Sequence, residues 1–487
     1  MNYETVIGLE VHVQLLTRSK MYCGCSADYA SDPPNTHVCP VCLGMPGVLP
    51  TINRKAVEYT IMTALALNCT VAGVTKFDRK NYPYPDLMKG YQISQFDAPI
   101  GETGSITLEV DGKTKTAHIK RVHLEEDVAK LVHRGTSWGE TYSLVDVNRS
   151  GVPLMEVVGE PDLRSPEEAR QYLMKLHTIM QYLGVSTANM EEGSFRCDAN
   201  ISIRPEGAEE TFAKVEVKNM NSFKAVFGAL EYEEKRQRQV AEEGGRLVQE
   251  TRGWIDDKGI TVSQRSKEYA HDYRYFPEPD LPPVVLSSSL VDTIKESLPE
   301  LPDTKRDRFT KECGLPLYDA NLLSATRAMA EYFETCLRHS WDAPLEKRAK
   351  TTSNWLLGDM TRLLYNKSID ISKCQVTPEH LVGLLVLVEG SKISGPTAKA
   401  VLEEMFDTGK HAEEIVSQKG LTQISDASAL EGVVQEVIAA NPKAVQDFKG
   451  GKEQSMKFLV GQVMRATKGR GDPKLLDKML REALERM

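Results

Sequence analysis

Apolar and polar positions alternate strictly in several stretches of the first part of the chain. In residues 7–15 the odd positions are apolar, whereas the even positions carry Gly8, Glu10, His12 and Gln14. Such alternation predicts a β-strand with one buried and one polar face. The pattern recurs in HIKRVHLEED, SLVDVNRSG, FRCDANISIR and KVEVKN. We therefore predict five strands that share one polar face.

Two helices are expected beside these strands. Residues 165–184 begin with Ser165 as N-cap and Pro166 at the first helical position, and Gly184 ends the helix. A second, heavily charged amphipathic pattern runs over about residues 222–243. Helices packed against an antiparallel sheet with one polar face predict an α+β domain.

Domain boundaries are expected after a proline-rich run and within a helical region. The run YFPEPDLPPVV predicts the end of the first domain near residue 290. The patterns that follow are helical, and the last of them form a small helical unit. We predict three domains: an α+β domain over 1–290, a helical domain over 291–405 and a helical tail over 406–487.

The composition is that of an ordinary globular protein, with 487 residues, 41% hydrophobic and 26% charged. No apolar run approaches the roughly 20 residues of a membrane-spanning helix. The first residues lack the basic and apolar regions of a secretory signal, so a cytoplasmic or organelle-matrix location is expected. A net charge of −9 argues against a general nucleic-acid coat, although a local basic surface is compatible with it.

Four of the nine cysteines form two close pairs. Cys23 and Cys25 form a CxC motif, and Cys39 and Cys42 form a CxxC motif after a short polar loop. Two such pairs predict a closed, structural zinc site with four thiolate ligands. His37, in the same loop, is a possible substitute ligand. The other cysteines are expected in the core as small apolar residues: Cys69, Cys197, Cys313, Cys336 and Cys374.

The shared polar face is the first candidate for chemistry. Hard oxygen ligands and one imidazole are supplied by Glu10, His12, Glu125, Asp198 and Glu216. Mg²⁺ usually takes one or two carboxylates, several waters and substrate phosphates. The alternative is an ordinary solvated sheet face. The preference for His, Asn, Arg, Asp and Glu over Lys, Thr and Ser is unusual for a solvated face, and because the strand order is unknown both interpretations stay open.

The segment 264–281 is a candidate nucleotide site. Its functional side chains are Arg265, Lys267, Asp272, Tyr273, Arg274 and Tyr275. Arginine and lysine could hold phosphates, the aspartate could complete a metal shell, and a tyrosine could flank an adenine. The alternative is a charged linker whose tyrosines pack on the sheet.

The C-terminal residues 451–487 are basic, with nine Lys or Arg against five acidic residues, a net charge of +4. Four basic residues lie in or beside a glycine-rich turn: Arg465, Lys468, Arg470 and Lys474. They are candidates for contacting the phosphates of a nucleic-acid backbone. The alternative interpretation is a helical hairpin whose basic side chains are solvated. No GxxxxGK[ST] loop and no GxSxG motif occur in the sequence, which excludes a P-loop NTPase.

These stretches together resemble the B-subunit family of the glutamyl/aspartyl-tRNA amidotransferases. The matching blocks include IGLEVHVQL, HLEEDVAKL, VDVNRSGVPLMEVV, SFRCDANISIRP, EVKNMNSFKAV, RSKEYAHDYRYFPEPDLPP and GQVMRATKGRGDP. The resemblance implies a cradle-shaped N-terminal domain, a helical domain and a YqeY-like tail that helps to hold tRNA. It also implies a heterotrimer with an amidase (A) subunit and a small C subunit.

The implied reaction is a ligase reaction in two steps on misacylated tRNA(Gln) or tRNA(Asn). ATP phosphorylates the side-chain carboxylate on the tRNA, and ammonia released from glutamine by the amidase then displaces phosphate. The resemblance places Mg²⁺ around Glu10, His12 and Glu125, and the strand pattern alone extends the ligand set to Asp198 and Glu216.

Two departures from the family pattern matter. Gln264 and Tyr269 replace the expected Met and Glu around the RSKE motif, and the four cysteines occur in only some members. Two competing interpretations stay open: a non-catalytic tRNA-binding or editing-like module, and a free-standing ATP-dependent ligase acting on a small acid. The basic tail argues against the ligase, and the polar strands argue against the pure binding module.

Overall fold

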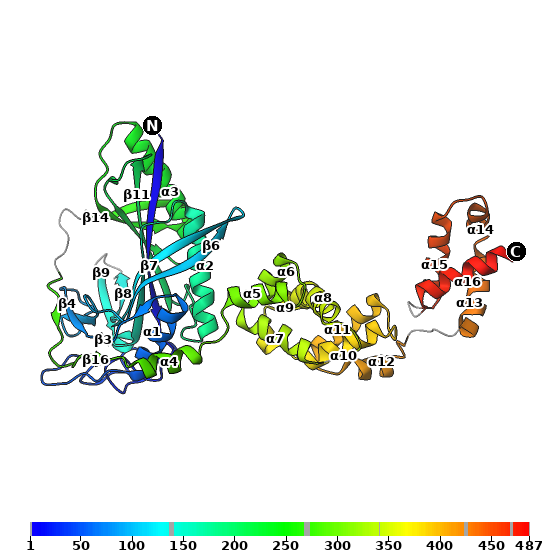
Figure 1. Ribbon diagram of the computed structural model, residues 1–487, viewed down its shortest axis with the longest axis horizontal. Helices are drawn as coiled ribbons and strands as arrows, with labels where there is room; N and C mark the ends of the chain where they lie inside the picture. Colours follow the sequence, from blue (N-terminus) through cyan, green and yellow to red (C-terminus); the bar gives the residue numbers. More distant parts are fainter. Residues whose placement is uncertain are drawn as a thin grey trace. The chain divides into compact units, whose positions relative to one another are not determined.

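The computed structural model describes residues 2–135, 141–266, 273–339, 341–422, 427–467 and 471–486. The chain divides into two compact units, residues 1–301 and 302–487 (Figure 1). The first contains all the described strands, and the second is built from helices. The predicted α+β class followed by helical regions is confirmed, whereas the boundaries near 290 and 405 stay predictions.

A nine-stranded sheet forms the centre of the first unit, in the order β14-β13-β12-β11-β1-β10-β7-β6-β2. Neighbouring strands are antiparallel except β12 and β13, which are parallel, so the sheet is mixed. The strands are β1 (Tyr3–Gln14), β2 (Thr70–Val71), β6 (Gly101–Val110), β7 (Lys113–Glu126), β10 (Pro153–Gly159), β11 (Phe195–Pro205), β12 (Val215–Met220), β13 (Glu250–Ile255) and β14 (Ile260–Ser266). Four of the five alternating stretches are therefore confirmed as strands of one sheet: β1, β7, β11 and β12.

The fifth stretch was assigned wrongly. SLVDVNRSG contributes to β9 (Thr141–Asp146), which among the described strands pairs only with β8 (Lys130–Gly135), and then to a 3-10 turn. Its polar side chains serve the turn, since the Asp146 carboxylate accepts from the backbone N–H of Asn148 and of Asn35. The strand that enters the main sheet is β10, in which the first five residues are all buried, so it has no alternation to detect.

Three helices cover the apolar face of the sheet: α1 (Arg54–Ala66), α2 (Pro166–Leu183) and α3 (Phe223–Glu242). The odd residues of β1, such as Ile7 and Leu9, are completely or almost completely buried in the same cluster. The predicted signals of α2 are present, because the Ser165 hydroxyl accepts from a backbone N–H of the first turn and Gly184 adopts a φ of 66°. The helices leave the opposite, polar face of the sheet to the functional site (Figure 1).

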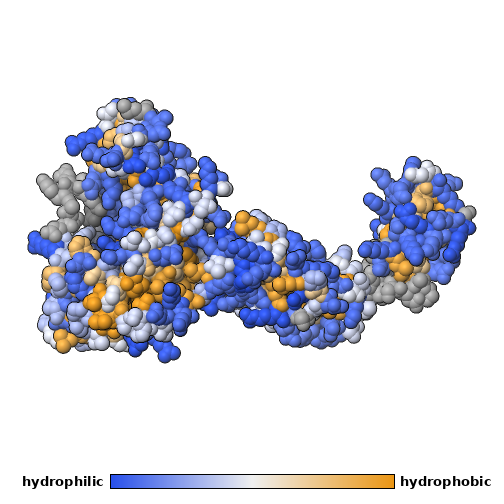
Figure 2. Space-filling model, viewed as in Figure 1, coloured by the Kyte–Doolittle hydropathy of each residue, from blue (hydrophilic) through white to orange (hydrophobic). Residues whose placement is uncertain are grey.

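Small sheets adjoin this polar face. One contains β15 (Phe276–Pro277), β4 (Asp78–Asn81) and β5 (Tyr91–Ser94), and another pairs β16 (Val284–Val285) with β3 (Val74–Thr75). Helix α4 (Ser288–Glu296) then packs against α1. Figure 2 shows hydrophobic residues gathered over the region of α1 and α4 in this view.

The second unit is described as a series of helices joined by short turns. They are α5 (Pro302–Lys311), α6 (Leu317–Leu323), α7 (Arg327–Arg338), α8 (Leu345–Trp355), α9 (Thr361–Lys367), α10 (Pro378–Glu389), α11 (Gly395–Thr408), α12 (Ala412–Lys419), α13 (Ala427–Ala440), α14 (Pro442–Lys449), α15 (Gln454–Ala466) and α16 (Pro473–Glu485). The two predicted tail helices are α15 and α16, and the Asp472 carboxylate caps α16 by accepting from two backbone N–H groups. Within the described ranges, no helix combines the length and apolar character needed to span a bilayer.

Candidate functional site

Strand register lines up four polar side chains across the centre of the sheet. His12 on β1 lies directly opposite Arg196 on β11 and opposite Glu156 on β10. Glu156 in turn lies opposite His123 on β7. Residues that face each other on paired strands share one side of a sheet. The row Arg196–His12–Glu156–His123 therefore crosses the polar face over four adjacent strands.

Three residues of this region form a group that fits a metal ion: His12, Glu125 and Glu156 offer ligand atoms within 4.8 Å of one another. The Nε2 atom of His12 lies 3.4 Å from Oε2 of Glu156 and 3.8 Å from Oε1 of Glu125. Both carboxylates are buried, whereas 22% of the His12 side chain is exposed, so the group opens to solvent on one side. Two carboxylates and an imidazole leave room for waters and phosphate oxygens around Mg²⁺. We call these three residues the metal group.

The charges in the metal group stabilise one another. Burial disfavours the charged form of His12, but Glu156 and then Glu125 outweigh it and raise the His12 pKa to about 9. Burial also disfavours charge on both carboxyls, yet the neighbouring imidazoles hold the pKa of Glu156 and of Glu125 below its usual range. His123, with Nε2 3.1 Å from Glu156, has a raised pKa for the same reason as His12. The two carboxylates are thus balanced by cationic imidazoles, and a divalent cation bound by His12 would take the place of its proton.

The small β15-β4-β5 sheet supplies one wall of the site. The Ser94 hydroxyl donates to Glu125 over 3.1 Å. The ammonium of Lys80 lies 5.1 Å from the ring centroid of Tyr273 and 5.9 Å from that of Tyr82. Burial opposes the charge of Lys80, but the attraction of Glu125 outweighs it and raises its pKa. Tyr273, a predicted nucleotide-site residue, therefore contacts a cation that is attracted to the metal group.

The remaining predicted magnesium ligands lie in a second polar cluster on β1, β11 and β12. The Glu10 carboxylate accepts from the Asn200 amide over 2.9 Å. The ammonium of Lys218 lies 2.5 Å from Asp198 and 3.3 Å from Glu216. The structure thus brings two of the five predicted ligands into the metal group. The other three, in the part of the chain that the structure describes, contact amide and ammonium groups instead.

Glu156 was missed by the sequence analysis. It lies in the buried strand β10, whose apolar residues show no alternating pattern. The available signal was a single carboxylate inside the run PLMEVVG. An isolated carboxylate costs free energy to bury, so a buried glutamate is expected to have a cationic or hydrogen-bonding partner. In the structure Glu156 lies next to the imidazoles of His12 and His123.

Part of the predicted nucleotide segment is described. Residues 267–272 of the segment lie outside the described ranges, and Lys267 and Asp272 are among them. Arg265 belongs to β14, and Arg274 adopts a φ of 45° with its carbonyl oxygen accepting from the side chain of Asn81. The ring of Tyr275 stacks on Phe96 with the centroids 4.2 Å apart. The face of this tyrosine is therefore covered by a protein ring, whereas Tyr273 lies beside Lys80 and makes edge contacts with Tyr82 and Tyr275.

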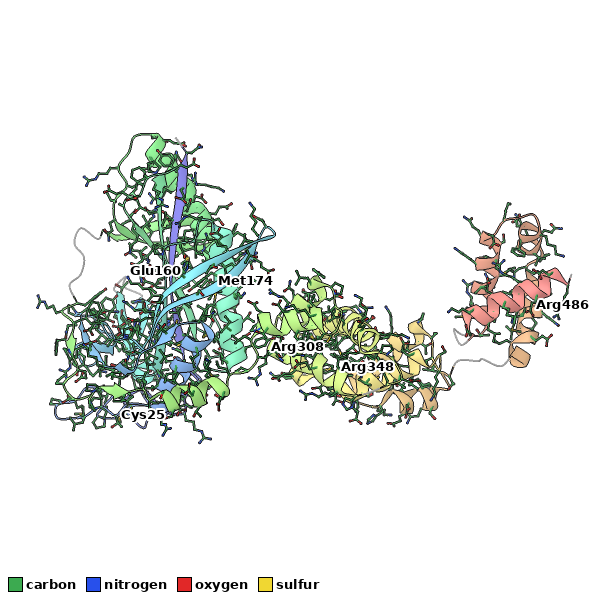
Figure 3. The ribbon with its side chains drawn as sticks, viewed as in Figure 1. Cys25, Glu160, Met174, Arg308, Arg348 and Arg486 are labelled. Carbon is green, nitrogen blue, oxygen red and sulfur yellow. The ribbon has the colours of Figure 1, made fainter. Side chains whose placement is uncertain are left out.

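The four paired cysteines meet at one point in the first unit, where Figure 3 labels Cys25. Their sulfur atoms lie within 4.8 Å of one another: Cys23, Cys25, Cys39 and Cys42. The backbone N–H of Cys39 donates to the Cys42 sulfur over 3.1 Å, and a hydrogen bond from Cys23 chiefly lowers the Cys42 pKa to about 4. His37 is not needed as a ligand, because its ring pairs with Asp32 at 2.5 Å. Four sulfurs at this spacing fit a tetrahedral zinc ion.

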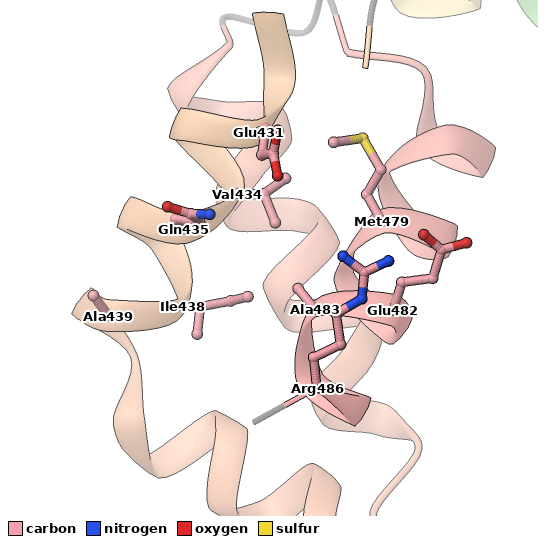
Figure 4. Close-up of a pocket in the computed structure, with 9 residues that line it drawn as sticks. All are labelled: Glu431, Val434, Gln435, Ile438, Ala439, Met479, Glu482, Ala483 and Arg486. Atoms are coloured by element: carbon pink, nitrogen blue, oxygen red, sulfur yellow. The ribbon is translucent and has the colours of Figure 1, made fainter. Parts of the chain in front are cut away.

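The tail residues predicted to grip tRNA are partly described. Arg465 at the end of α15 and Lys474 at the start of α16 are exposed. The other two, Lys468 and Arg470, lie outside the described residues. A separate groove between α13 and α16 is lined by apolar residues such as Val434, Ile438 and Met479 (Figure 4). Among the predicted site residues that the structure describes, none lines this groove.

Comparisons with known proteins agree with the resemblance drawn from the motifs. Residues 5–292 match the family model of the GatB/GatE catalytic domain, and residues 331–484 match that of the GatB domain. The chain is 61% identical to the B subunit of the aspartyl/glutamyl-tRNA(Asn/Gln) amidotransferase of Dehalococcoides mccartyi (strain CBDB1), over 99% of both chains. It is 55% identical to the protein of the same name from Thermomicrobium roseum and 54% to that from Carboxydothermus hydrogenoformans, over 100% of this chain and 99% of each relative. The chain belongs to the family of aspartyl/glutamyl-tRNA(Asn/Gln) amidotransferase B subunits.

Proposed function

We propose that this chain carries out the carboxylate-activating and amide-forming steps of a tRNA-dependent amidotransferase. It converts Glu-tRNA(Gln) to Gln-tRNA(Gln), Asp-tRNA(Asn) to Asn-tRNA(Asn), or both. The proposal is supported by family membership together with one structural observation, the metal group of His12, Glu125 and Glu156 on the open polar face.

The chemistry explains why such a group is required. A carboxylate is a poor electrophile, because its leaving group would be an oxide ion. Transfer of the γ-phosphoryl group of ATP to one carboxylate oxygen gives an acyl phosphate, and attack by ammonia then expels phosphate and leaves the amide. A magnesium ion held by the metal group would neutralise phosphate charge during this transfer.

The nucleotide is proposed to bind beside the metal group. The segment that follows β14 contains basic side chains for phosphates, and Tyr273 lies next to Lys80 at the wall of the site. The residues assigned to ATP are Arg265, Lys267, Asp272, Tyr273 and Arg274. Glu10, Asp198 and Glu216, on the adjacent strands, are proposed to extend the metal-binding surface once Lys218 is displaced.

Ammonia is proposed to come from another chain. The sequence has no recognisable glutaminase signature, which agrees with an amidase (A) subunit that hydrolyses glutamine and a small C subunit that joins the two. The subunit designation in the relatives' names fits such an assembly. We place this heterotrimer in the cytoplasm.

Transfer RNA is proposed to contact the basic tail through Arg465, Lys468, Arg470 and Lys474. The double substitution Arg465→Ala with Lys474→Ala replaces the two described residues and should weaken binding of all tRNA sequences. The slope of the logarithm of the binding constant against the logarithm of the salt concentration should fall by about the amount that two phosphate contacts contribute. Unchanged affinity and an unchanged salt slope would show that the tail does not contact tRNA.

The four cysteines are proposed to bind a structural zinc ion.

The reaction is tested with ammonium in place of glutamine. The purified heterotrimer is given Glu-tRNA(Gln), ATP and ammonium, so that glutaminase activity is not required. We expect amide formation by the unmodified complex, and its loss in Glu125→Ala and Glu10→Ala with tRNA binding retained. Glu231→Ala, an exposed position of α3, is the matched control. Full activity of both active-site variants would refute the metal assignment, and tRNA binding without any amide formation would favour a pure binding module.

A further inference from the structure

Arg196 occupies a fixed position beside the metal group. It lies opposite His12 on the polar face, and its Nη2 donates to the Asp127 carboxylate over 2.9 Å. Asp127 is itself held in place, because it is buried and accepts from the Gln14 amide over 2.6 Å and from the Val128 N–H over 2.9 Å. Two well-anchored contacts of this kind restrict a carboxylate to one orientation. The guanidinium of Arg196 is therefore preorganised at the edge of the site.

One buried donor of this guanidinium has no acceptor among the described residues. The Nε atom of Arg196 is buried, and the residues that the structure describes provide it with no hydrogen-bond partner. Arg149 offers a contrast, since it also faces Asp127 at 3.7 Å but donates to the carbonyl oxygens of Val128 and Ala129. A buried donor without an acceptor costs free energy that a bound ligand can recover. Arg196 thus has the unmatched donor that a binding group requires, whereas the Nε donor of Arg149 is already bonded to the Val128 carbonyl oxygen.

Charge on the polar face limits what the ligand can be. The carboxylates of Glu125 and Glu156 lie on the same part of the polar face as Arg196, so an anionic substrate entering the site needs a cation to receive it. Phosphate oxygens can share the cation of the metal group. The substrate carboxylate, which must approach the same point as a nucleophile, needs a second positive group. A guanidinium pairs with a planar carboxylate through two parallel N–H donors.

We propose that Arg196 binds the side-chain carboxylate of the aminoacyl-tRNA and thereby distinguishes the acid substrate from the amide product. The inference rests on the proposed function. An amide replaces one acceptor oxygen with an NH₂ donor, which would face the donors of Arg196. The product therefore loses one hydrogen bond and the ionic attraction. Arg196 would favour Glu-tRNA or Asp-tRNA on entry and release Gln-tRNA or Asn-tRNA after the reaction.

The test compares Arg196→Met and Arg196→Lys with Arg149→Met in the full heterotrimer. Affinities are measured for Glu-tRNA(Gln) and for Gln-tRNA(Gln), and kcat/KM is measured separately for Glu-tRNA(Gln) and ATP with ammonium as nitrogen donor. We expect Arg196→Met to lower kcat/KM for Glu-tRNA(Gln) by about 10- to 100-fold, the effect of losing one hydrogen bond to a charged group. The preference for Glu-tRNA over Gln-tRNA should disappear, and the KM for ATP should not change. Arg196→Lys should keep part of the preference.

The control separates substrate binding from support of the fold. Arg149→Met also removes a positive neighbour of Asp127, and it should keep the full preference for Glu-tRNA. An Arg196→Met complex with the unmodified Glu-to-Gln preference would overturn the inference. A rise in the KM for ATP alone would overturn it in favour of a phosphate-binding arginine. If Arg196→Met does not assemble, the preference of Arg196→Lys decides the same question. An unmodified complex that forms no amide would refute the proposed function instead.

Discussion

The ion pair of Arg79 and Glu278 joins β4 to the segment that returns beside the site. Arg79 donates through Nε and Nη2 to the two carboxylate oxygens of Glu278, each over 2.7 Å. The Glu278 side chain is completely buried, whereas 20% of the Arg79 side chain is exposed. Because Lys80 follows Arg79 on β4 and contacts Tyr273, this pair supports the wall of the metal group.

Arg79→Met should destabilise this part of the first unit strongly. Two hydrogen bonds between charged groups contribute at least about 1.5 kcal/mol each, which gives about 3 kcal/mol. The uncompensated buried carboxylate of Glu278 adds a further cost, and removal of one partner of a buried pair costs about 3–5 kcal/mol. We expect the variant to lose that amount of local stability. The double variant Arg79→Met with Glu278→Gln should recover part of it, because a neutral amide is less costly to bury.

The assay is hydrogen–deuterium exchange of the β4 amides and of the Phe276 amide in β15, since a chain of two units need not unfold in a single step. Exchange in these strands should accelerate by about 100-fold or more, which is the factor that 3 kcal/mol represents. Arg54→Met is the control, because Arg54 is 83% exposed and its pair with Glu58 contributes at most about 1 kcal/mol. Equal exchange in Arg79→Met and Arg54→Met would refute the reasoning.

Three further predictions concern pH, backbone approach and zinc. Burial alone would raise the pKa of Glu250, but hydrogen bonds and nearby guanidinium groups lower it. The ionised carboxylate therefore stabilises the fold above about pH 4.3, and this stabilisation is lost as the pH falls through the lowered pKa. In urea titrations at pH 3–6, Glu250→Gln should make the free energy of unfolding less dependent on pH. Gly101→Ala would place a methyl group 2.6 Å from the methyl group of Ala64 in α1. Thermal unfolding should then report a loss of about 1–3 kcal/mol in the free energy of unfolding. No loss would mean that helix and strand separate without cost. Metal analysis should find about one zinc per chain and none after Cys39→Ser with Cys42→Ser, and equal zinc in both would refute the site.

The alternating strands were predictable because each has one buried and one polar face. β1, β7, β11 and β12 all show this pattern, and the capped helix α2 carries local signals at both ends. The prediction failed for SLVDVNRSG, which lies partly in the separate β8–β9 pair and partly in a 3-10 turn, and it missed β10, which is buried almost throughout. Period-two patterns detect half-buried strands, whereas a fully buried strand shows none.

The composition of the metal group depends on register, which the sequence does not specify. His12 and Glu125 lie on strands that are not neighbours, and β10 between them contributes Glu156. Glu10 lies two residues before His12 and follows the same alternation. It faces Asp198 and the Asn200 amide instead of the metal group. The sequence therefore identified the polar face, whereas its magnesium chemistry stays a prediction. The choice of which three side chains meet required the strand order.

The central claim is that His12, Glu125 and Glu156 form the cation site of the reaction, and anomalous X-ray diffraction tests it most directly. Crystals of the complex with Mn²⁺ in place of Mg²⁺ and a non-hydrolysable ATP analogue would be measured near the manganese absorption edge. The account predicts a peak about 2.1–2.2 Å from one ligand atom of each residue, with a nucleotide phosphate in the same coordination shell. A manganese peak bound elsewhere on the sheet, with these three residues uncoordinated, would contradict it.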